Sequence, residues 1–289
     1  MKVAIIGGGK MGRWFTKFFI EEGYSVTVSS RTREKLLALK DEFAVEIAEG
    51  NIEAIKGANR VLLCVPLEDL EVVLEEISPH IRSKQIVMDI CSIKEIPVNL
   101  LHKYVKKGIV LGIHPVFGPG AKSIKGQNIV LTPINDKEMK YAMKFGTWLE
   151  KKGAKVVITS PKDHDELMSI VLGFPHFLGL VVGETLLNYS SFMEAKEVAG
   201  ASYKLLLTLV EAVASEETSF YSNLQMSLPE VEKIESLFLE KVEEWLELVR
   251  RKDCSGFSGR MEQVKKRLKD LDPYYEQYYE AMYRLLDDS

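Results

Sequence analysis

Short apolar runs alternate with amphipathic helical patterns over the first 160 residues of the chain. The runs predicted as strands are residues 3–6, 25–29, 61–65, 85–89, 109–112, 128–131 and 155–159, and the helical patterns between them are 11–22, 33–42, 69–77, 97–105 and 137–151. Strands that alternate with helices are typical of βαβ units. We therefore predict an α/β domain over residues 1–160, with a mostly parallel, doubly wound sheet of the Rossmann type.

The pattern changes after Thr159, and no further strand is predicted. Ser160, Pro161 and Asp163 have the residue types of a helix start: a hydroxyl N-cap, a proline at the first helical position and an acid in the first turn. Helical periods then cover residues 163–189, 194–215, 230–250, 260–271 and 274–286. We predict an all-α substrate and dimerisation domain over residues 161–289, which could cover the cofactor cleft.

Composition excludes several classes of protein. Hydrophobic residues make up 46% of the chain, enough for two cores. No apolar run approaches the ~20 residues of a bilayer span, and Met1 leads directly into a strand, so we expect no membrane association and no signal peptide. A net charge of −4 with both signs mixed argues against nucleic acid as a partner. Three widely separated cysteines form no disulfide framework or metal-ligand set, and we expect no metal site and a cytoplasmic location.

The helical half carries many apolar positions for a domain of about 130 residues. Such a domain could bury its surplus apolar surface against a second copy of itself. We therefore expect a homodimer, and sedimentation as a monomer at micromolar concentration would contradict this expectation.

A glycine-rich turn follows the first predicted strand. Gly7, Gly9 and Gly12 form the pattern G-x-G-x-x-G at the point where a strand passes into a helix, which is the context that this motif requires. Gly7 permits the tight turn, Gly9 lets the backbone approach a pyrophosphate, and Gly12 allows close packing of helix on strand. The helix N-terminus, with Lys10 and Met11, would then face the phosphates. The motif predicts a dinucleotide site.

The end of the second predicted strand indicates which dinucleotide binds. An NAD enzyme usually has an acid there for the ribose 2′-hydroxyl, whereas this chain has Ser30, Arg31 and Thr32, followed by Arg33. Hydroxyls and guanidinium groups suit a 2′-phosphate. We predict NADP, with NAD as the alternative if the arginines are ordinary solvated residues.

Val65-Pro66 ends the third long strand and would form a backbone wall beside the adenosine or ribose.

A candidate base follows Gly112 at the end of a later strand. His114 has an ordinary pKa suited to proton transfer near neutrality, and the loop Pro115 to Pro119 is rigid enough to hold its ring at a cleft. Ser92, after the neighbouring strand, could hydrogen-bond His114 and fix its tautomer, or could simply cap a helix. Lys94 could meet a substrate carboxylate, or could be a solvated charge.

Two more histidines lie in the first long helix of the second half. His164 is near the helix start, where a structural role is the simpler interpretation. His176 follows Gly173-Phe174-Pro175, and proline kinks helices. We place His176 in the substrate pocket. The twelve-residue offset between the two histidines argues against a shared helical face.

Taken together, these residues resemble the prephenate dehydrogenase family, which includes arogenate dehydrogenases. The matching elements, in the family's order, are Gly7-x-Gly9-x-x-Gly12, Asp89-x-x-Ser92-Ile93-Lys94, His114-Pro115-Val116-Phe117-Gly118-Pro119, His164-Asp165 and His176. The resemblance covers nearly the whole chain, and it includes a helical C-terminal half that dimerises in this family.

The resemblance implies an oxidative decarboxylation. His114 would accept the proton of the ring hydroxyl as C4 passes hydride to the nicotinamide, and the ring carboxylate would leave as CO2 because aromatisation drives its loss. Ser92 would orient His114, and His176 and Lys94 would bind polar groups of the substrate. The product would be 4-hydroxyphenylpyruvate, a tyrosine precursor.

One departure from the family concerns an arginine that grips a substrate carboxylate in many members. The aligned helix, from Tyr203 to Ala212, contains none. Lys204 could substitute, or Arg260 from elsewhere, so prephenate and arogenate both stay open as substrates. Deazaflavin-dependent NADP reductases and imine reductases share the opening of the chain but would not require His114, and a nucleotide sensor without turnover is a further alternative.

Overall fold

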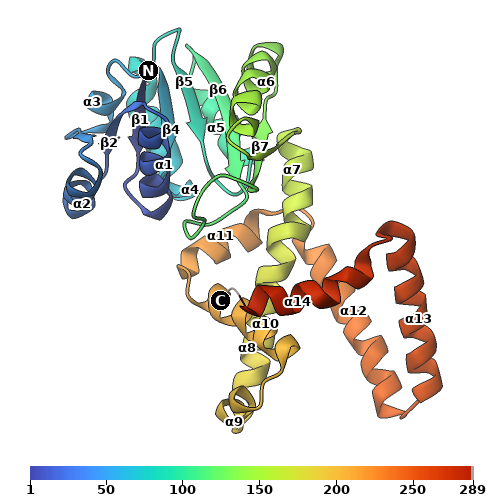
Figure 1. Ribbon diagram of the computed structural model, residues 1–289. Helices are drawn as coiled ribbons and strands as arrows, with labels where there is room; N and C mark the ends of the chain where they lie inside the picture. The colour runs from blue at the N-terminus through green and yellow to red at the C-terminus, as the bar shows by residue number, and fades with distance from the viewer. Residues whose placement is uncertain (288–289) are drawn as a thin grey trace. The chain divides into compact units, whose positions relative to one another are not determined.

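The computed structural model describes residues 1–287 and divides the chain into two compact units. The first unit spans Met1–Leu167, and the second takes the chain from Met168 onward. Figure 1 shows the sheet in the first unit and helices alone in the described part of the second.

The first unit is built on one eight-stranded sheet with the order β3-β2-β1-β4-β5-β6-β7-β8. The strands are β1 (Lys2–Ile6), β2 (Ser25–Ser29), β3 (Glu46–Ile47), β4 (Arg60–Leu63), β5 (Ile86–Asp89), β6 (Ile109–Pro115), β7 (Asn128–Thr132) and β8 (Lys155–Ile158). All neighbours pair in parallel except β6 and β7. The mostly parallel sheet predicted from the sequence is confirmed.

Helices cover both faces of this sheet. They are α1 (Lys10–Glu21), α2 (Arg33–Phe43), α3 (Asn51–Ile55), α4 (Leu67–Ile77), α5 (Glu95–Tyr104) and α6 (Asp136–Glu150), with a 3₁₀ turn η1 (Ser78–His80). Val3 and Ile5 of β1 pack with α1, α2 and α6, whereas Ala4 and Ile6 pack with α3, α4 and α5. Because successive strand residues point to opposite faces, each face carries its own core, and the fold is doubly wound.

Two short elements escaped the sequence patterns. The strand β3 has two residues and the helix α3 has five, which is too few for either period to be recognised. A predicted strand also proved too short: β6 runs on past Gly112 to Pro115, so His114 lies within the strand.

The helix α7 (Pro161–Met168) starts as predicted. The Ser160 hydroxyl oxygen accepts the backbone N–H of Asp163 at 3.1 Å, which is an N-cap hydrogen bond. The run continues through a π-helical turn, η2 (Ser169–Gly173), into α8 (Phe174–Leu187). The division between the two units falls inside this run, so the first turns of α7 belong with the sheet.

The second unit contains helices in all its remaining elements. They are α9 (Phe192–Glu197), α10 (Ala201–Ala214), α11 (Thr218–Ser227), α12 (Val231–Arg250), α13 (Cys254–Leu271), η3 (Tyr275–Gln277) and α14 (Tyr278–Asp287). The prediction of a single helix over 194–215 is wrong, because α9 ends at Glu197 and α10 starts anew after its N-cap residue Gly200. The helix α11 was not predicted. The helix α13 starts before the predicted residue 260, since Asp253 caps it by accepting the Gly256 N–H at 2.8 Å.

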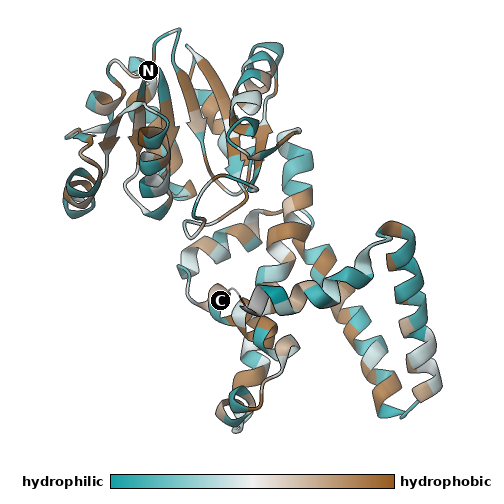
Figure 2. Cartoon of the chain, in the orientation of Figure 1, coloured by the Kyte–Doolittle hydropathy of each residue, from teal (hydrophilic) through white to brown (hydrophobic). Residues whose placement is uncertain are grey.

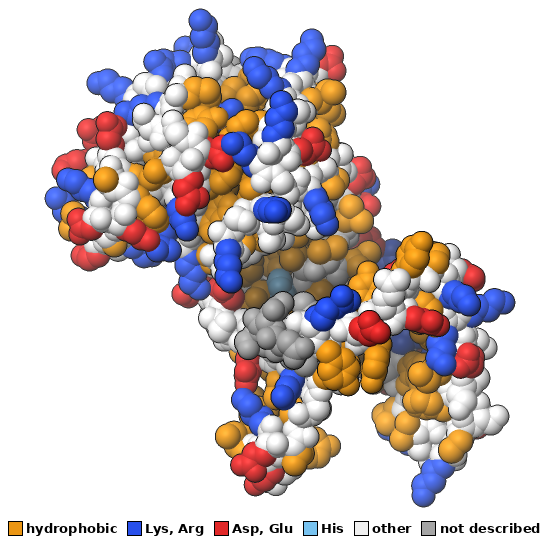
Figure 3. Space-filling view, in the orientation of Figure 1, with side chains coloured by type: hydrophobic (Ala, Val, Ile, Leu, Met, Phe, Trp, Pro, Cys, Tyr) orange, Lys and Arg blue, Asp and Glu red, His pale blue; other side chains and the backbone are white. Residues whose placement is uncertain are grey.

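Glycines set the packing of α8 on α10. A Cβ atom on Gly179 would lie 2.9 Å from Val213, and one on Gly183 would lie 2.9 Å from Val210. Only glycine lets the two helices approach this closely. Large apolar side chains remain exposed on the second unit, including Leu237, Leu246 and Val264 on α12 and α13. Hydrophobic residues recur along α12 in Figure 2, and hydrophobic side chains lie at the molecular surface in this part of Figure 3.

The expectation that no apolar run approaches a membrane span was too strong. By length and composition alone, the 27-residue helical run Pro161–Leu187, which contains an 18-residue window with a mean hydropathy of 1.8, could cross a membrane. The core helix of a soluble protein can have the same length and composition, and this run carries the buried polar residues His164 and Asp165. The absence of membrane association stays a prediction.

Candidate active site

The glycine turn between β1 and α1 has the geometry that a bound pyrophosphate requires. Gly7 has φ +108°, and a Cβ there would collide with the Cys64 carbonyl oxygen. A Cβ on Gly12 would collide with the Gly7 carbonyl oxygen, whereas one on Gly9 would meet open space. No side chain caps the N-terminus of α1, where Lys10 and Met11 stand. The backbone N–H groups of a helix N-terminus beside open space form a cradle for an anion, so these residues fit a dinucleotide.

The end of β2 carries the groups predicted to select the nucleotide. The Ser30 hydroxyl oxygen accepts the Thr32 backbone N–H at 3.3 Å. The Arg31 guanidinium donates to both carboxylate oxygens of Asp69, at 3.0 and 2.5 Å, and its side chain is 82% exposed. Exposed ion pairs contribute little to stability, so a phosphate could compete for Arg31 at small cost.

Val65 and Pro66 follow β4, and Pro66 is the N-cap residue of α4. β4 lies beside β1 in the sheet, so this dipeptide leaves the sheet at the same edge as the glycine turn. The position agrees with a backbone wall beside the nucleotide.

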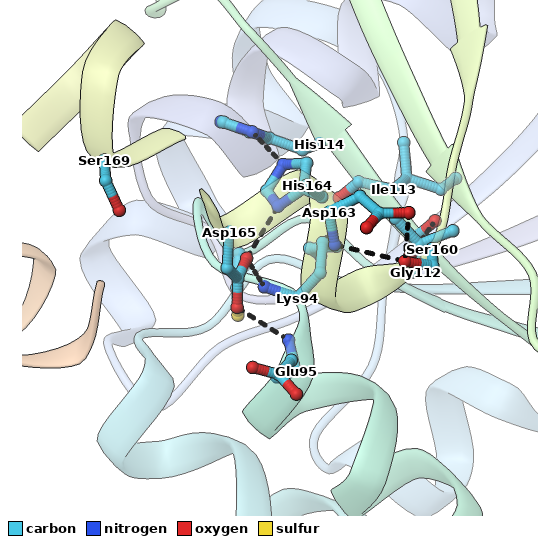
Figure 4. Close-up of polar contacts among 12 residues, drawn as sticks. Lys94, Glu95, Gly112, Ile113, His114, Ser160, Asp163, His164, Asp165 and Ser169 are labelled. Carbon is cyan, nitrogen blue, oxygen red and sulfur yellow. Dashed lines mark hydrogen bonds and ion pairs between the residues drawn. The ribbon is translucent and has the colours of Figure 1, made fainter. Parts of the chain in front are cut away.

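His114 lies on β6 with only 2% of its surface exposed. Its register partner is Val130 of β7, and the β6–β7 pair is antiparallel. The ring nitrogen Nδ1 is 2.8 Å from Nε2 of His164, the hydrogen bond at the centre of Figure 4. Since β1, β4, β5 and β6 are parallel neighbours, His114 lies at the sheet edge that carries the glycine turn.

The partner of His114 is therefore His164 of α7. Ser92, predicted to orient His114, lies partly exposed between β5 and α5, and no hydrogen bond joins the two in the part of the chain that the structure describes. The assignment of His164 to a merely structural role at a helix start needs revision, because its ring contacts the candidate base directly.

A hydrogen-bond chain continues from His164 to Asp165. His164 Nδ1 lies 2.6 Å from Asp165 Oδ1. Asp165 Oδ1 and Oδ2 also accept the backbone N–H groups of Lys94, at 2.7 Å, and of Glu95, at 2.9 Å. One carboxylate thus joins the first turn of α5 to α7 and also holds the ring of His164 (Figure 4).

Lys94 does not stand free for a substrate carboxylate. The side chain is fully buried, its ammonium group forms an ion pair with Asp89, and it donates a hydrogen bond to the Ile113 carbonyl oxygen at 2.9 Å. A buried charge requires a partner, and Asp89 at the end of β5 supplies it. Lys94 therefore supports the backbone next to His114 instead of binding substrate.

Burial governs the titration of the site. It holds the pKa of His114 well below its usual value, with further lowering by His164 and Lys94. Burial also lowers the pKa of His164, against the opposing effect of the Asp165 carboxylate. Burial raises the pKa of Asp89, while the Lys94 ammonium opposes the rise. Both histidines are neutral near pH 7, the form in which an imidazole can accept a proton.

His176 stands on α8 in the second unit, with its ring centroid 4.4 Å from that of Tyr221 on α11. Burial lowers its pKa, and its Nδ1 atom has no hydrogen-bond partner among the residues described. A half-buried ring with an open nitrogen can accept or donate a hydrogen bond to a ligand.

Neither cation proposed to replace the family arginine is joined to His176. Lys204 is exposed on α10, and within residues 1–287 no hydrogen bond or ion pair links its side chain to His176. Arg260 forms an ion pair with Glu244 and stacks 4.9 Å from the ring of Trp245, so the α12–α13 pair already uses its charge.

The sequence patterns brought Asp89 and His164-Asp165 into the resemblance to the family but assigned none of the three a role in the site. One signal was available: His164-Asp165 directly follows a capping motif, and two adjacent polar residues in an apolar helix need buried partners.

Two family models match adjacent parts of the chain: the prephenate dehydrogenase nucleotide-binding domain over residues 15–158 and the prephenate dehydrogenase dimerization domain over residues 160–263. A probable arogenate/prephenate dehydrogenase of Methanocaldococcus jannaschii is 34% identical over 270 residues. That match covers 92% of this chain but only 60% of the relative's length.

Solved structures share the fold. Prephenate dehydrogenase from Aquifex aeolicus, in complex with hydroxyphenyl propionate and NAD+, has a TM-score of 0.76 at 20% identity, covering 94% of this chain and 98% of that one. Arogenate dehydrogenase from Synechocystis has a TM-score of 0.73 at 17% identity, and the match covers 95% of this chain and 100% of that one.

Proposed function

The chain belongs to the prephenate dehydrogenase family, and on that premise we propose that it converts prephenate to 4-hydroxyphenylpyruvate with hydride transfer to NADP. The observation that carries the proposal is a buried, neutral His114 at the sheet edge that also holds the glycine turn. A base and a nucleotide cradle on one edge are what the oxidation of a ring alcohol needs.

The reaction assigns each residue a definite task. When bound, the dinucleotide supplies the hydride acceptor. His114 takes the proton of the ring hydroxyl at Nε2 while the carbinol carbon gives up hydride, which leaves a ketone. Loss of the ring carboxylate as CO2 then leaves its electron pair in the ring and gives an aromatic phenolate, which becomes the phenol by taking a proton from water. His176, with its open Nδ1, and Lys204 are proposed to bind the substrate's polar groups, and Ser92, partly exposed beside this edge, is proposed to meet the substrate or the nicotinamide end of the cofactor.

The substrate and cofactor are tested together by measuring nicotinamide reduction with prephenate and with arogenate, each with NADP and with NAD. Fast reduction with prephenate and NADP is the expected result. Activity with arogenate alone would keep the mechanism and change the substrate. No reduction in any of the four combinations would contradict the proposed function.

Arg31→Ala should weaken NADP and spare NAD. Charge-assisted hydrogen bonds contribute about 1.5–3 kcal/mol each, so we expect the KM for NADP to rise roughly tenfold to a hundredfold. The KM for NAD should barely change, because its ribose carries no 2′-phosphate. Arg250→Ala, which removes an exposed arginine at the end of α12, outside the nucleotide-binding unit, is the control. Equal losses for both cofactors in Arg31→Ala would show that Arg31 does not meet the phosphate.

We also propose a homodimer. The described helices of the second unit expose many large apolar side chains, and the family model that matches this part of the chain describes a dimerization domain. Burial of these side chains against a second copy would remove their apolar surface from water.

A further inference from the structure

His164 uses both of its ring nitrogens, one for the candidate base and one for a carboxylate. Nε2 faces His114 Nδ1 at 2.8 Å, and Nδ1 faces Asp165 Oδ1 at 2.6 Å. His164 is fully buried, and His114 nearly so. A helix-start histidine that served only to fill space would need neither contact, so the geometry points to a role in the chemistry of His114.

The contacts fix the position of every proton in the neutral pair. Asp165 accepts two backbone N–H bonds, which marks it as the ionised acceptor, so the His164 proton lies on Nδ1. His164 Nε2 is then a lone pair, and His114 must donate its own proton from Nδ1 to it. His114 Nε2 is thereby left unprotonated, which is the form that a general base requires.

We propose that His164 is the second member of a proton relay, in which the charge that His114 acquires from the substrate comes to rest on His164 beside Asp165. A proton enters at His114 Nε2, the Nδ1 proton of His114 passes to His164 Nε2, and no other bond changes. Once the product has left, the reverse transfers return the proton to His114 Nε2 and from there to water. The inference rests on the proposed function for its catalytic consequence only.

The surrounding charges favour this destination. His114 on β6 faces His164 and the Lys94 ammonium, and it has no carboxylate partner within the described residues. His164 on α7 faces the same ammonium, but it also contacts the Asp165 carboxylate directly. The negative charge of Asp89 on β5 further favours a protonated His164. An imidazolium is therefore better stabilised at His164 than at His114.

The kinetic test is His164→Gln, because a glutamine oxygen can accept the His114 Nδ1–H but cannot take the proton. We expect kcat to fall about ten- to a hundredfold, less than the roughly 10²–10⁴-fold cost of losing a general base. The KM for the substrate and the affinity for NADP should stay close to the wild-type values. The acid limb of the pH–rate profile should move to lower pH, since the proton must then stay on a buried His114 without a carboxylate. His80→Gln, at an exposed position, is the control.

A His164→Gln enzyme with wild-type kcat and an unmoved acid limb would overturn the proposal, since a hydrogen-bond acceptor alone would then suffice. Thermal unfolding of the variant shows whether it folds.

A second readout uses the wild-type protein and requires no turnover, so it separates this proposal from the proposed function. Nitrogen-15 NMR of histidine-labelled protein follows only five histidines. We expect His114 and His164 both to carry their neutral proton on Nδ1, and His164 to gain positive charge before His114 on acidification. A neutral His114 protonated on Nε2, or His114 charging first, would exclude the relay even if the enzyme oxidised prephenate rapidly.

Discussion

His114→Asn is expected to lower turnover by about 10²–10⁴-fold, the usual contribution of a general base. Asparagine is the matched replacement, because its amide N–H can still donate to His164 Nε2 in place of the imidazole Nδ1–H. What it lacks is the lone pair that Nε2 presents to the substrate hydroxyl. Steady-state kcat with saturating substrate and cofactor measures the loss.

The NADP affinity of His114→Asn should stay close to that of the wild type, because the glycine turn and the end of β2 are untouched. The residual activity should also lose the acid limb that protonation of the base produces. His80→Asn, at an exposed site, should behave as wild type. A fully active His114→Asn enzyme would remove His114 from the chemistry.

Local patterns predicted the parts of the fold that depend on local physics. The alternation of Val3, Ala4, Ile5 and Ile6 between two apolar surroundings is what a strand buried on both faces requires, and the two cores confirm it. The glycines at 7, 9 and 12 were recognisable because a side chain at any of them is incompatible with the site. At Gly7 and Gly12 it would collide with the backbone, and at Gly9 it would fill the space for the pyrophosphate.

Contacts between residues far apart in the chain were beyond such patterns. The hydrogen bond from His114 to His164 spans 50 residues, and the one from the Lys94 backbone to Asp165 spans 71. Neither periodicity nor spacing shows that α7 meets β6, so Ser92, closer in sequence, was assigned the contact that His164 makes. Lys94 was misjudged for the same reason, since a lysine in a loop shows no sign of its buried partner.

Lys94→Met tests that correction and should strongly destabilise the first unit. Methionine keeps most of the side-chain volume but leaves the Asp89 carboxylate buried with no counter-charge. Breaking a buried pair by removing one partner costs about 3–5 kcal/mol. The Ile113 carbonyl oxygen also loses its hydrogen bond, so the backbone beside His114 is less firmly held. The thermal midpoint of the unit should fall by roughly 6–20 °C.

The double variant Asp89→Asn, Lys94→Met separates charge from packing. Asparagine is neutral, and its carbonyl oxygen can still accept the Cys91 backbone N–H that Asp89 Oδ1 accepts at 3.0 Å. Because both charges are gone, much of the lost stability should return, as is common when a buried ion pair is replaced as a whole. The two single variants and the double variant form a cycle that measures the coupling between Asp89 and Lys94. If Lys94 met a substrate carboxylate instead, Lys94→Met would keep the wild-type midpoint and raise KM, and the double variant would recover nothing.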